Sequence, residues 1–288
     1  MELKDGMLDV DAVAVVEASL REDIGSGDVT TLSLVNPEIM ATGEILAREP
    51  CVVAGVSVAC KVLELVDAKL ETDILVPDGE QVDAGDAIIS IHGSAASILT
   101  AERTALNFMQ RMCGIATLTR GFVNVVKPFD TMILDTRKTT PTLRAFEKYA
   151  VLCGGGTNHR FGLYDRVLVK DNHRKLWEGG DSDRLDLAVE AARKAFPEVM
   201  VEMEVEIVEE CKSALRAAPE WIMLDNMSCE MMSECVQLCK GVSKTEASGG
   251  ITLGRAREVA ETGVDAISLG CLTHSARAVD LSLEWSVV

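Results

Sequence analysis

The residues best suited to chemistry gather between Asp135 and Lys175, where the charge of the sequence reverses. Nine Lys and Arg stand against three acids between Arg137 and Lys175, whereas the whole chain has 28 Lys and Arg against 46 Asp and Glu. Guanidinium groups fit carboxylates and phosphates with paired hydrogen bonds, and Lys supplies a compact charge for a phosphate oxygen. The stretch therefore predicts a pocket for an anionic small molecule. The alternative is a solvated helix face held by ion pairs, which the shortage of local acids disfavours.

A second group of polar residues stands at the ends of predicted strands. Six short apolar runs alternate with helical segments, at residues 133–135, 166–170, 199–206, 221–225, 243–248 and 266–270. Six such units in a row predict a parallel sheet, closed or nearly closed into an α/β barrel. At or just before the carboxyl ends of these strands stand Asp135, Lys170, Glu204, Asp225, Ser248 and Gly270. We expect the active site there, because the loops after the strands converge at that end of a barrel.

Two acids in this group widen the chemistry beyond anion binding. Glu204 and Asp225 beside bound phosphates suit Mg²⁺, which takes one or two protein carboxylates together with water and substrate oxygens, and they equally suit ribose hydroxyls. The Ser248-Gly249 turn and the LGCLTH segment that ends at His274 offer backbone N–H groups for a phosphate. GGGTNHR lacks the Lys and Ser or Thr of a P-loop, and no HExxH is present. The four His are too dispersed to form a zinc site.

Length and composition limit the class of protein. The 288 residues accommodate two domains, or one large α/β domain with an appendage. The net charge of −18 argues against nucleic acid or an anionic membrane as partner. Nine Cys without a CxxC pair indicate reduced thiols, of which Cys229, Cys235 and Cys239 are helically spaced and expected to pack in a core. No apolar run is long enough to cross a bilayer and no export signal is visible, so a soluble, cytoplasmic chain is expected.

The first hundred residues predict a smaller α+β module. A first helix is expected to end near Gly25, and EDIGSGDVTT after it is expected to form a loop with no helix following. Short β-rich runs then surround one helix at residues 56–66, and a long helix begins at Ser97. The final segment, AVDLSLEWSVV, is expected to pack back on the rest as a short amphipathic or extended element.

Ten motifs occur in order between residues 22 and 283. They are EDIGSGDVTT, AERTALNFMQRMCGIAT, DTRKTTP, KYAVLCGGGTNHRFGLYD, VKDNH, EMEVE, MLDNM, ASGGI, GVDAISLG and THSARAVDLSL. Together they resemble the quinolinate phosphoribosyltransferase family, the decarboxylating nicotinate-nucleotide pyrophosphorylases of NAD synthesis. The departures from the family pattern remove no charge: Thr142 and Cys113 stand where Gly and Ser are frequent, and Met203 lies within a usual EVE.

The resemblance implies an α/β fold of two domains. Residues 1–108 are expected to form an open-faced α/β sandwich on which the tail 275–288 packs, and residues 109–274 an incomplete, seven-stranded α/β barrel. The six strands visible in the sequence are one short of that barrel. The resemblance also implies a homodimer, or a higher oligomer, in which the neighbouring subunit completes each site.

The resemblance further implies a pentosyltransferase that joins quinolinate to 5-phosphoribosyl-1-pyrophosphate with Mg²⁺, giving nicotinate mononucleotide, carbon dioxide and pyrophosphate. The quinolinate carboxylates are expected to lie among Arg137, His159, Arg160 and Lys170, with Arg103 from the other subunit. The donor is expected to lie beside Lys138, Lys170, Ser248, Gly249, Gly270 and His274. Ribose and Mg²⁺ are expected at Glu204 and Asp225, directly or through water or pyrophosphate. The expected catalytic residues are Lys138, Lys170, Glu204 and Asp225.

Three alternatives share some of these features. The molybdenum-transport-associated pyrophosphorylase-like protein has the same fold and much of the motif set, and an assay with quinolinate separates the two. A Schiff-base lyase would use Lys170, but the neighbouring cations and the lack of a partner acid–base set disfavour it. A non-catalytic carrier is suggested by VPDGEQVDAGDAIISIHG, which resembles the hairpin of biotinyl and lipoyl carrier domains. No Lys lies between Lys69 and Arg103 to hold such a cofactor.

Overall fold

The chain folds into two compact units that do not follow the order of the sequence. The structure is a computed structural model, which describes residues 10–178 and 184–286. The first unit, here the N-terminal unit, comprises residues up to 120, 138–155 and from 271 onward. The second, here the barrel unit, comprises residues 121–137 and 156–270. The expected boundary between residues 108 and 109 stays a prediction.

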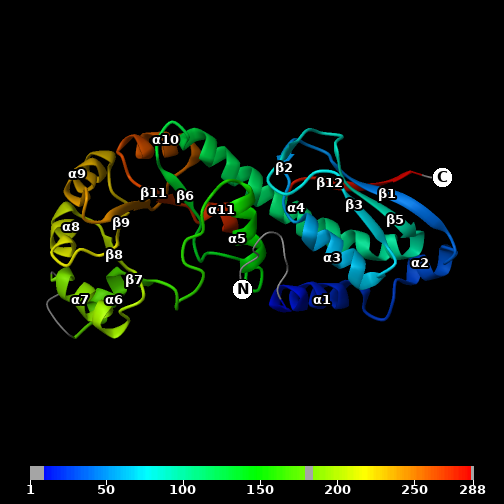
Figure 1. Cartoon of the computed structure of the whole chain (residues 1–288), viewed down its shortest axis with the longest axis horizontal. Coiled ribbons are helices and arrows are strands. Elements are labelled where there is room, and N and C mark those ends of the chain that lie inside the picture. Colours follow the sequence, from blue (N-terminus) through cyan, green and yellow to red (C-terminus); the bar gives the residue numbers. More distant parts are fainter. Residues whose placement is uncertain (1–9, 179–183, 287–288) are drawn as a thin grey trace. The chain divides into compact units, whose positions relative to one another are not determined.

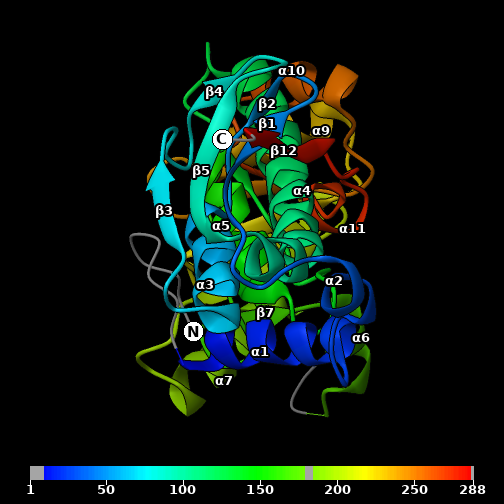
Figure 2. The same cartoon turned by 90° about the vertical axis from the view of Figure 1, so that its right-hand side faces the viewer.

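An antiparallel sheet of four strands organises the N-terminal unit (Figure 2). Its order is β12-β1-β5-β3, so the C-terminal strand pairs with the first strand of the chain. The alternating pattern GEILA in β1 places Ile45 and Ala47 in the core. The strands are β1 (Met40–Ala47), β3 (Glu71–Ile74), β5 (Ala87–Ser94) and β12 (Leu281–Ser286), with the separate pair β2 (Cys51–Val52) and β4 (Gln81–Val82).

Six helices belong wholly or mainly to this unit, and α3 lies between the sheet and α1 in Figures 1 and 2. The expected helix at residues 56–66 is confirmed, and the expected long helix begins at Ala95, two residues before Ser97. The helices are α1 (Val10–Ile24), α2 (Val29–Leu34), α3 (Val56–Val66), α4 (Ala95–Val126), α5 (Arg144–Cys153) and α11 (Cys271–His274). Residues 121–126 at the end of α4 belong to the barrel unit.

Helix α2 corrects the expectation that EDIGSGDVTT is a loop with no helix after it. Asp28 is the N-cap, and its carboxylate accepts hydrogen bonds from the Thr31 N–H at 3.0 Å and from the Thr31 hydroxyl at 2.5 Å. A side-chain acceptor at this position satisfies a backbone donor that a helix start otherwise leaves free. The first helix ends at Ile24, close to Gly25 as predicted. Helix α2 was not predicted, because a helical period cannot be recognised in only six residues.

A parallel sheet of six strands forms the barrel unit, in the order β6-β11-β10-β9-β8-β7. All six strands expected from the sequence are confirmed. Their bounds are β6 (Met132–Leu134), β7 (Val167–Val169), β8 (Val201–Val205), β9 (Trp221–Asp225), β10 (Lys244–Ser248) and β11 (Ala266–Ser268). The resemblance implied a seventh strand. Between β6 and β7 in the sequence, the described chain has instead one isolated parallel bridge from Leu134 to Thr157.

Helices cover the outer side of this sheet, as Figure 1 shows for α8, α9 and α10. They are α6 (Asp171–Leu176), α7 (Leu185–Ala195), α8 (Val208–Leu215), α9 (Cys229–Cys239) and α10 (Leu253–Glu261). In α9 the expected packing holds for Cys235 and Cys239, which are buried, whereas Cys229 is only half-buried. The fold is therefore the expected α/β arrangement, an antiparallel sheet with helices and a parallel, barrel-like sheet. In the described residues no helix has the length and apolar character that crossing a membrane requires.

Candidate active site

Four residues of the predicted site lie together at the carboxyl ends of β9, β10 and β11. Asp225 ends β9 and stands opposite Ser248, which ends β10, and Gly270 follows β11. Gly249 has a φ of +94°, and a Cβ there would lie 2.2 Å from Asn226 Oδ1, so only glycine fits. The Ser248-Gly249 turn therefore packs directly against Asn226, the residue after β9, with no room for a side chain between them.

Lys170 and Glu204 form an ion pair at the carboxyl ends of β7 and β8. The Lys170 Nζ lies 2.7 Å from Glu204 Oε2, and Glu204 is buried while Lys170 is partly exposed. β7 and β8 are neighbours in the sheet, so side chains that project inward from their ends meet. The ion pair restrains both side chains, so their charged groups are already fixed in position before a ligand binds.

Arg137 and Arg160 supply positive charge that their surroundings do not fully compensate. The Arg137 Nε is buried and makes no hydrogen bond within the described part of the chain. Burial, and then the charge of Arg137, lower the pKa of the Arg160 guanidinium, and Glu202 and Asp165 only partly offset this. Arg137 and the partly buried Arg160 therefore present guanidinium groups of the kind that pair with carboxylates and phosphates.

His159 belongs to a buried network that the sequence analysis did not foresee. Its Nε2 lies 3.1 Å from Glu202 Oε2 and 3.3 Å from Glu246 Oε2. Arg166 Nη1 also donates to Glu202 Oε2, at 3.1 Å. The backbone N–H of His159 donates to Asp135 at 2.9 Å, so Asp135 anchors the loop rather than facing a ligand.

The network changes the proton affinity of its members. Burial lowers the pKa of His159, but the bonds to Glu202 and Glu246 outweigh it and raise that pKa to about 9. The Arg160 N–H, which donates to His159 Nδ1 at 2.7 Å, opposes protonation. The carboxylates outweigh this effect, because charge-assisted hydrogen bonds are roughly twice as strong as neutral ones. Burial and then the charge of Glu202 raise the pKa of Glu246.

Among the described residues, His159, Glu202 and Glu246 form the one group of three or more side chains that could together hold a metal ion. The ligand atoms of His159, Glu202 and Glu246 lie within 4.8 Å of one another. The guanidinium of Arg166, at 3.1 Å from Glu202 and 3.4 Å from His159 Nε2, already supplies a cation there. A divalent ion would meet strong repulsion from it. The network is therefore better described as a buried charge cluster than as a metal centre.

The sequence alone did not indicate three members of the network around His159, namely Glu202, Glu246 and Arg166. Glu202 and Glu204 alternate along an apolar strand, and side chains two residues apart share a face. That spacing was the available signal, because β8 is buried throughout. Glu246 lies likewise on the buried strand β10.

The expected surplus of unpaired cations in residues 137–175 is partly wrong, because acids from distant segments pair several of them. Lys170 pairs with Glu204 and Arg166 with Glu202, both from β8. Arg174 pairs with Glu210, whereas Lys175 pairs locally with Asp171, one of the three acids of the stretch itself. The residues that keep uncompensated charge are accordingly fewer than the sequence indicated, and Arg137 and Arg160 stand out among them.

Three further predicted residues belong to the N-terminal unit. Arg103 lies on α4, its side chain is 59% exposed, and its ion-pair contact is a long one of 3.8 Å to Glu102. Lys138 and His274 are exposed, and the His274 ring contacts the Ser275 hydroxyl at 2.6 Å. Their roles stay predictions.

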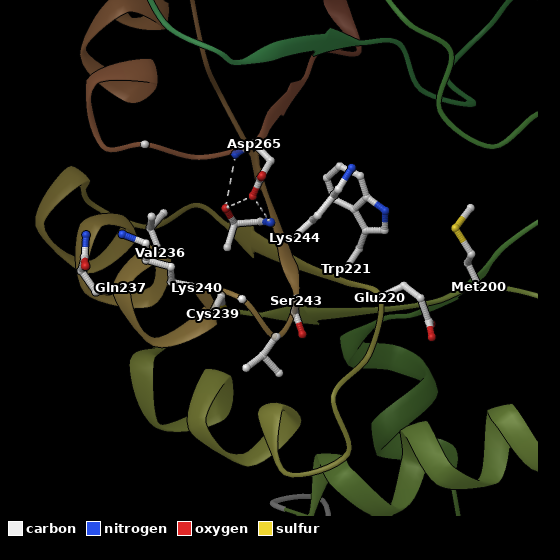
Figure 3. Close-up of a pocket in the computed structure, with 14 residues that line it drawn as sticks. Met200, Glu220, Trp221, Val236, Gln237, Cys239, Lys240, Ser243, Lys244 and Asp265 are labelled. Atoms are coloured by element: carbon white, nitrogen blue, oxygen red, sulfur yellow. Dashed lines mark hydrogen bonds between the residues drawn. The ribbon is translucent and has the colours of Figure 1, made fainter.

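A cavity of about 750 Å³ opens at the other end of the barrel strands (Figure 3). Its lining includes Glu220, Lys244 and Asp265, which precede or begin β9, β10 and β11. Asp265 is engaged by the backbone N–H and the hydroxyl of Thr245, at 2.8 and 2.9 Å. The cavity lies at the amino ends of the strands, so it is separate from the predicted site.

Comparison with known proteins identifies the family. Models of the N-terminal and C-terminal domains of quinolinate phosphoribosyl transferase match residues 28–113 and 115–284. The chain belongs to the quinolinate phosphoribosyl transferase family. The family resemblance found in the motifs is thereby confirmed.

Relatives in this family match over most of their length. The chain is 40% identical over 263 residues to the "Probable nicotinate-nucleotide pyrophosphorylase [carboxylating]" of Bacillus subtilis, covering 91% of this chain and 89% of that protein. It is also 40% identical over 290 residues to the "Nicotinate-nucleotide pyrophosphorylase [carboxylating], chloroplastic" of rice, covering 95% of this chain and 77% of that protein. The crystal structure of NadC from Streptococcus pyogenes superimposes with a TM-score of 0.93 at 37% identity, covering 99% of this chain and all of that one.

Proposed function

We propose that this chain transfers the phosphoribosyl group of 5-phosphoribosyl-1-pyrophosphate to quinolinate, with release of carbon dioxide and pyrophosphate, giving nicotinate mononucleotide for NAD biosynthesis. The names of the relatives point to this reaction. The observation that carries the proposal is the pair Arg137 and Arg160: the Arg137 Nε is buried without a hydrogen bond among the described residues, and the Arg137 charge lowers the pKa of the partly buried Arg160. A bound dianion relieves both the repulsion and the unmade hydrogen bond.

Quinolinate suits this pair because it carries two carboxylates on adjacent ring atoms. Arg137 and Arg160 offer planar forks for them, and Lys170 and His159 stand on the same unit. Nicotinate has a single carboxylate and would leave part of the cationic surface unpaired, at a cost of roughly 1–3 kcal/mol. The acceptor is therefore the dicarboxylate.

On the barrel unit, the donor side consists of Lys170, Ser248, Gly249 and Gly270, with Glu204 and Asp225 for the ribose and Mg²⁺, and the family resemblance adds Lys138 and His274. Asp225 is the last residue of β9 and Glu204 the last but one of the adjacent strand β8, which fits a cation that takes one or two protein carboxylates and substrate oxygens. When bound, Mg²⁺ supplies charge that neutralises the pyrophosphate. The Ser248-Gly249 turn presents backbone N–H groups to a phosphate.

The chemistry follows from electrostatics without a protein nucleophile. As pyrophosphate departs, the ribose carbon gains positive charge, and carboxylates and cations fixed in advance stabilise the separated charges. The quinolinate nitrogen then bonds that carbon and becomes a positively charged pyridinium. When the adjacent carboxylate leaves as carbon dioxide, its electron pair stays on the ring carbon, where the pyridinium charge stabilises it, and a proton from solvent then takes the place of the carboxylate. Lys170 is held by Glu204, and this argues against the Schiff-base alternative, which needs a free amine.

The active unit is a homodimer in the cytoplasm. An exposed apolar patch supports association, because Val29, Leu32 and Leu34 on α2 are each more than 70% exposed. Arg103 offers a solvent-exposed cation that a neighbouring subunit can use. Some plant relatives are named chloroplastic or mitochondrial, so localisation is a separate question from activity.

An assay with competing acceptors tests the proposal. The protein is incubated with 5-phosphoribosyl-1-pyrophosphate, Mg²⁺ and either quinolinate labelled in the carboxyl group next to the ring nitrogen or nicotinate. We expect labelled carbon dioxide and nicotinate mononucleotide from quinolinate alone, dependent on the donor. Equal efficiency with nicotinate, or no donor-dependent release from quinolinate, would contradict the proposal; the second outcome also favours the pyrophosphorylase-like alternative.

A further inference from the structure

A single arginine on α4 fastens two segments of the N-terminal unit that are far apart in the sequence. Arg111 donates through Nε and Nη2 to Glu147 Oε1, at 3.2 and 2.8 Å. Its Nη1 donates to the carbonyl of Ala276 at 2.9 Å, and its Nη2 also contacts the carbonyl of Thr273. One guanidinium therefore joins α5 to the segment that contains α11.

Glu147 extends this connection to the loop that follows Lys138. The carboxylate is fully buried, and it accepts from the backbone N–H of Thr140 at 3.1 Å and from the Thr140 hydroxyl at 2.8 Å. With the two bonds from Arg111, four donors satisfy one buried acid. A buried carboxylate that is fully hydrogen-bonded fixes the geometry of its donors, because any displacement leaves a charged group unsatisfied.

The loop is also held from the other side. The Thr273 hydroxyl donates to the carbonyl of Lys138 at 2.7 Å, and Thr273 precedes His274. The backbone is thus restrained at Lys138 and at Thr140, on either side of Thr139. Lys138 and His274 are separated by more than a hundred residues, yet both are anchored through bonds that converge on Arg111 and Glu147.

We propose that Arg111 and Glu147 are positioning residues for the phosphoribosyl donor, which hold Lys138 and His274 in register so that the two side chains bind the same anionic substrate. The inference rests on the proposed function for the identity of that substrate. Neither Arg111 nor Glu147 touches the donor, since the carboxylate is buried and the guanidinium is used in internal bonds. Their contribution is preorganisation, which lowers the entropic cost of binding.

Arg111→Lys is the first test, because lysine keeps the charge beside Glu147 but cannot reach the carboxylate and two carbonyls at once. We expect the KM and the directly titrated Kd for 5-phosphoribosyl-1-pyrophosphate to rise by about tenfold or more. The KM and Kd for quinolinate should change by less than about twofold, because the bonds of Arg111 go to Glu147 and to the carbonyls of Thr273 and Ala276, and none of them to Arg137 or Arg160. An equal loss of affinity for both substrates would mean that Arg111 only supports the fold and does not position the donor site.

A milder pair of variants keeps the inference testable if Arg111→Lys does not fold. Thr273→Val removes the bond to the Lys138 carbonyl with little change of shape, and the matched control is Thr117→Val. Thr117 lies on α4 and accepts from the Val52 N–H at 2.9 Å, with no bond to either anchored segment. We expect a fall in the melting temperature from the control, and about a threefold or larger loss of donor affinity from Thr273→Val alone.

The outcomes separate this inference from the proposed function. If the unmodified chain forms no nicotinate mononucleotide, the proposed function fails, but calorimetric titration with 5-phosphoribosyl-1-pyrophosphate alone still tests Arg111. Loss of donor affinity in Arg111→Lys and Thr273→Val, with unchanged quinolinate affinity, supports positioning. Unchanged donor affinity in both folded variants, or the same loss in Thr117→Val, overturns it.

Discussion

At the scale of single residues, Arg137 combines a functional charge with a structural cost. Its Nε is buried without a hydrogen bond among the described residues, and its charge lowers the pKa of Arg160. An unmade hydrogen bond and a repulsion between like charges lower the stability of the free protein, and a bound anion removes both. The proposed binding of an anion accounts for this arrangement.

Replacing Arg137 with Met should stabilise the free protein and impair quinolinate binding. Met keeps much of the volume but removes the unpaired donor and the repulsion on Arg160, so the melting temperature should rise. The KM for quinolinate should rise by about tenfold or more, because a charge-assisted hydrogen bond is lost. Thermal unfolding and steady-state kinetics measure the two effects. The control is Arg193→Met in the same unit, where loss of the bond to Glu220 should lower stability and leave kinetics unchanged.

Glu204→Gln and Asp225→Asn should reduce turnover far more than they weaken quinolinate binding. These acids are assigned to the ribose and Mg²⁺ side, where charge develops as pyrophosphate leaves. Steady-state kinetics at saturating substrates and direct titration with quinolinate separate the two quantities. Loss of quinolinate affinity with normal turnover would show that the assignment is wrong.

The stability of the protein should fall as pH rises through the range in which His159 loses its proton. The folded pKa is about 9, above the ordinary value of 6.5. A raised pKa means that the stabilisation is complete below about pH 6.5 and is lost between that value and pH 9. The contribution at low pH is roughly 3 kcal/mol. Denaturant unfolding from pH 6 to 10 measures this dependence of the free energy of unfolding on pH. In His159→Gln the dependence should be weaker than in the unmodified chain. The same dependence in both proteins would mean that His159 is already neutral in the folded protein at pH 6.

At the scale of elements, α4 gives a direct test of close packing. Gly114 and Gly121 lie seven residues apart on this helix, yet their surroundings differ. A Cβ on Gly114 would lie 1.9 Å from the Arg277 carbonyl oxygen, whereas one on Gly121 would approach only Leu253, at 4.0 Å. The first glycine allows the segment before β12 to lie against the helix, and the second has no such reason.

The same substitution at these two glycines should therefore have opposite effects. Gly121→Ala should stabilise the protein by about 0.5–1 kcal/mol, because alanine favours a helix over glycine. Gly114→Ala should destabilise it by about 1–3 kcal/mol or more, because the backbone contact must move apart. Urea unfolding of both variants measures the difference. A stabilised Gly114→Ala would mean that the segment around Arg277 does not depend on this contact.

Apolar patterns predicted the barrel strands, but not the elements that depend on a local cap or on a single bridge. All six barrel strands were predicted because short apolar runs alternate with helical segments, and the helix at residues 56–66 was predicted as well. Helix α2 was missed because its six residues depend on a cap at Asp28 rather than on a buried face. The seventh strand implied by the family is reduced to a bridge at Thr157, which no local pattern distinguishes from a loop.

The candidate site was predictable where it follows strand ends and not where it depends on pairing. Position alone identified Glu204, Asp225 and Ser248. The partners of the cations come from distant strands, as Glu202 does for Arg166, and sequence proximity cannot reveal them. The assignment of residues 138–155 to the same unit as α4 is likewise a matter of tertiary packing.

At the scale of the whole molecule, the proposed dimer explains why Arg103 is exposed. The residue lies on α4 in the N-terminal unit, and its contact with Glu102 is at 3.8 Å, too long for a strong ion pair. If its role were only that contact, Arg103→Ala would be nearly fully active. If a neighbouring subunit uses it to bind quinolinate, the variant should be nearly inactive while still folded and dimeric.

Subunit mixing distinguishes action within a chain from action across the dimer. Arg103→Ala and Lys138→Ala are each expected to be inactive alone. In a heterodimer, one site combines an intact Arg103 with an intact Lys138, and the other site carries both lesions. After random exchange of an equal mixture, half the dimers are heterodimers, so about a quarter of all sites should work, provided the interface is twofold symmetric. Subunit exchange is verified with a differently tagged unmodified chain. If exchange is complete and the mixture regains no activity, Arg103 acts within its own chain, and the exposed α2 patch must then be explained by something other than a shared site.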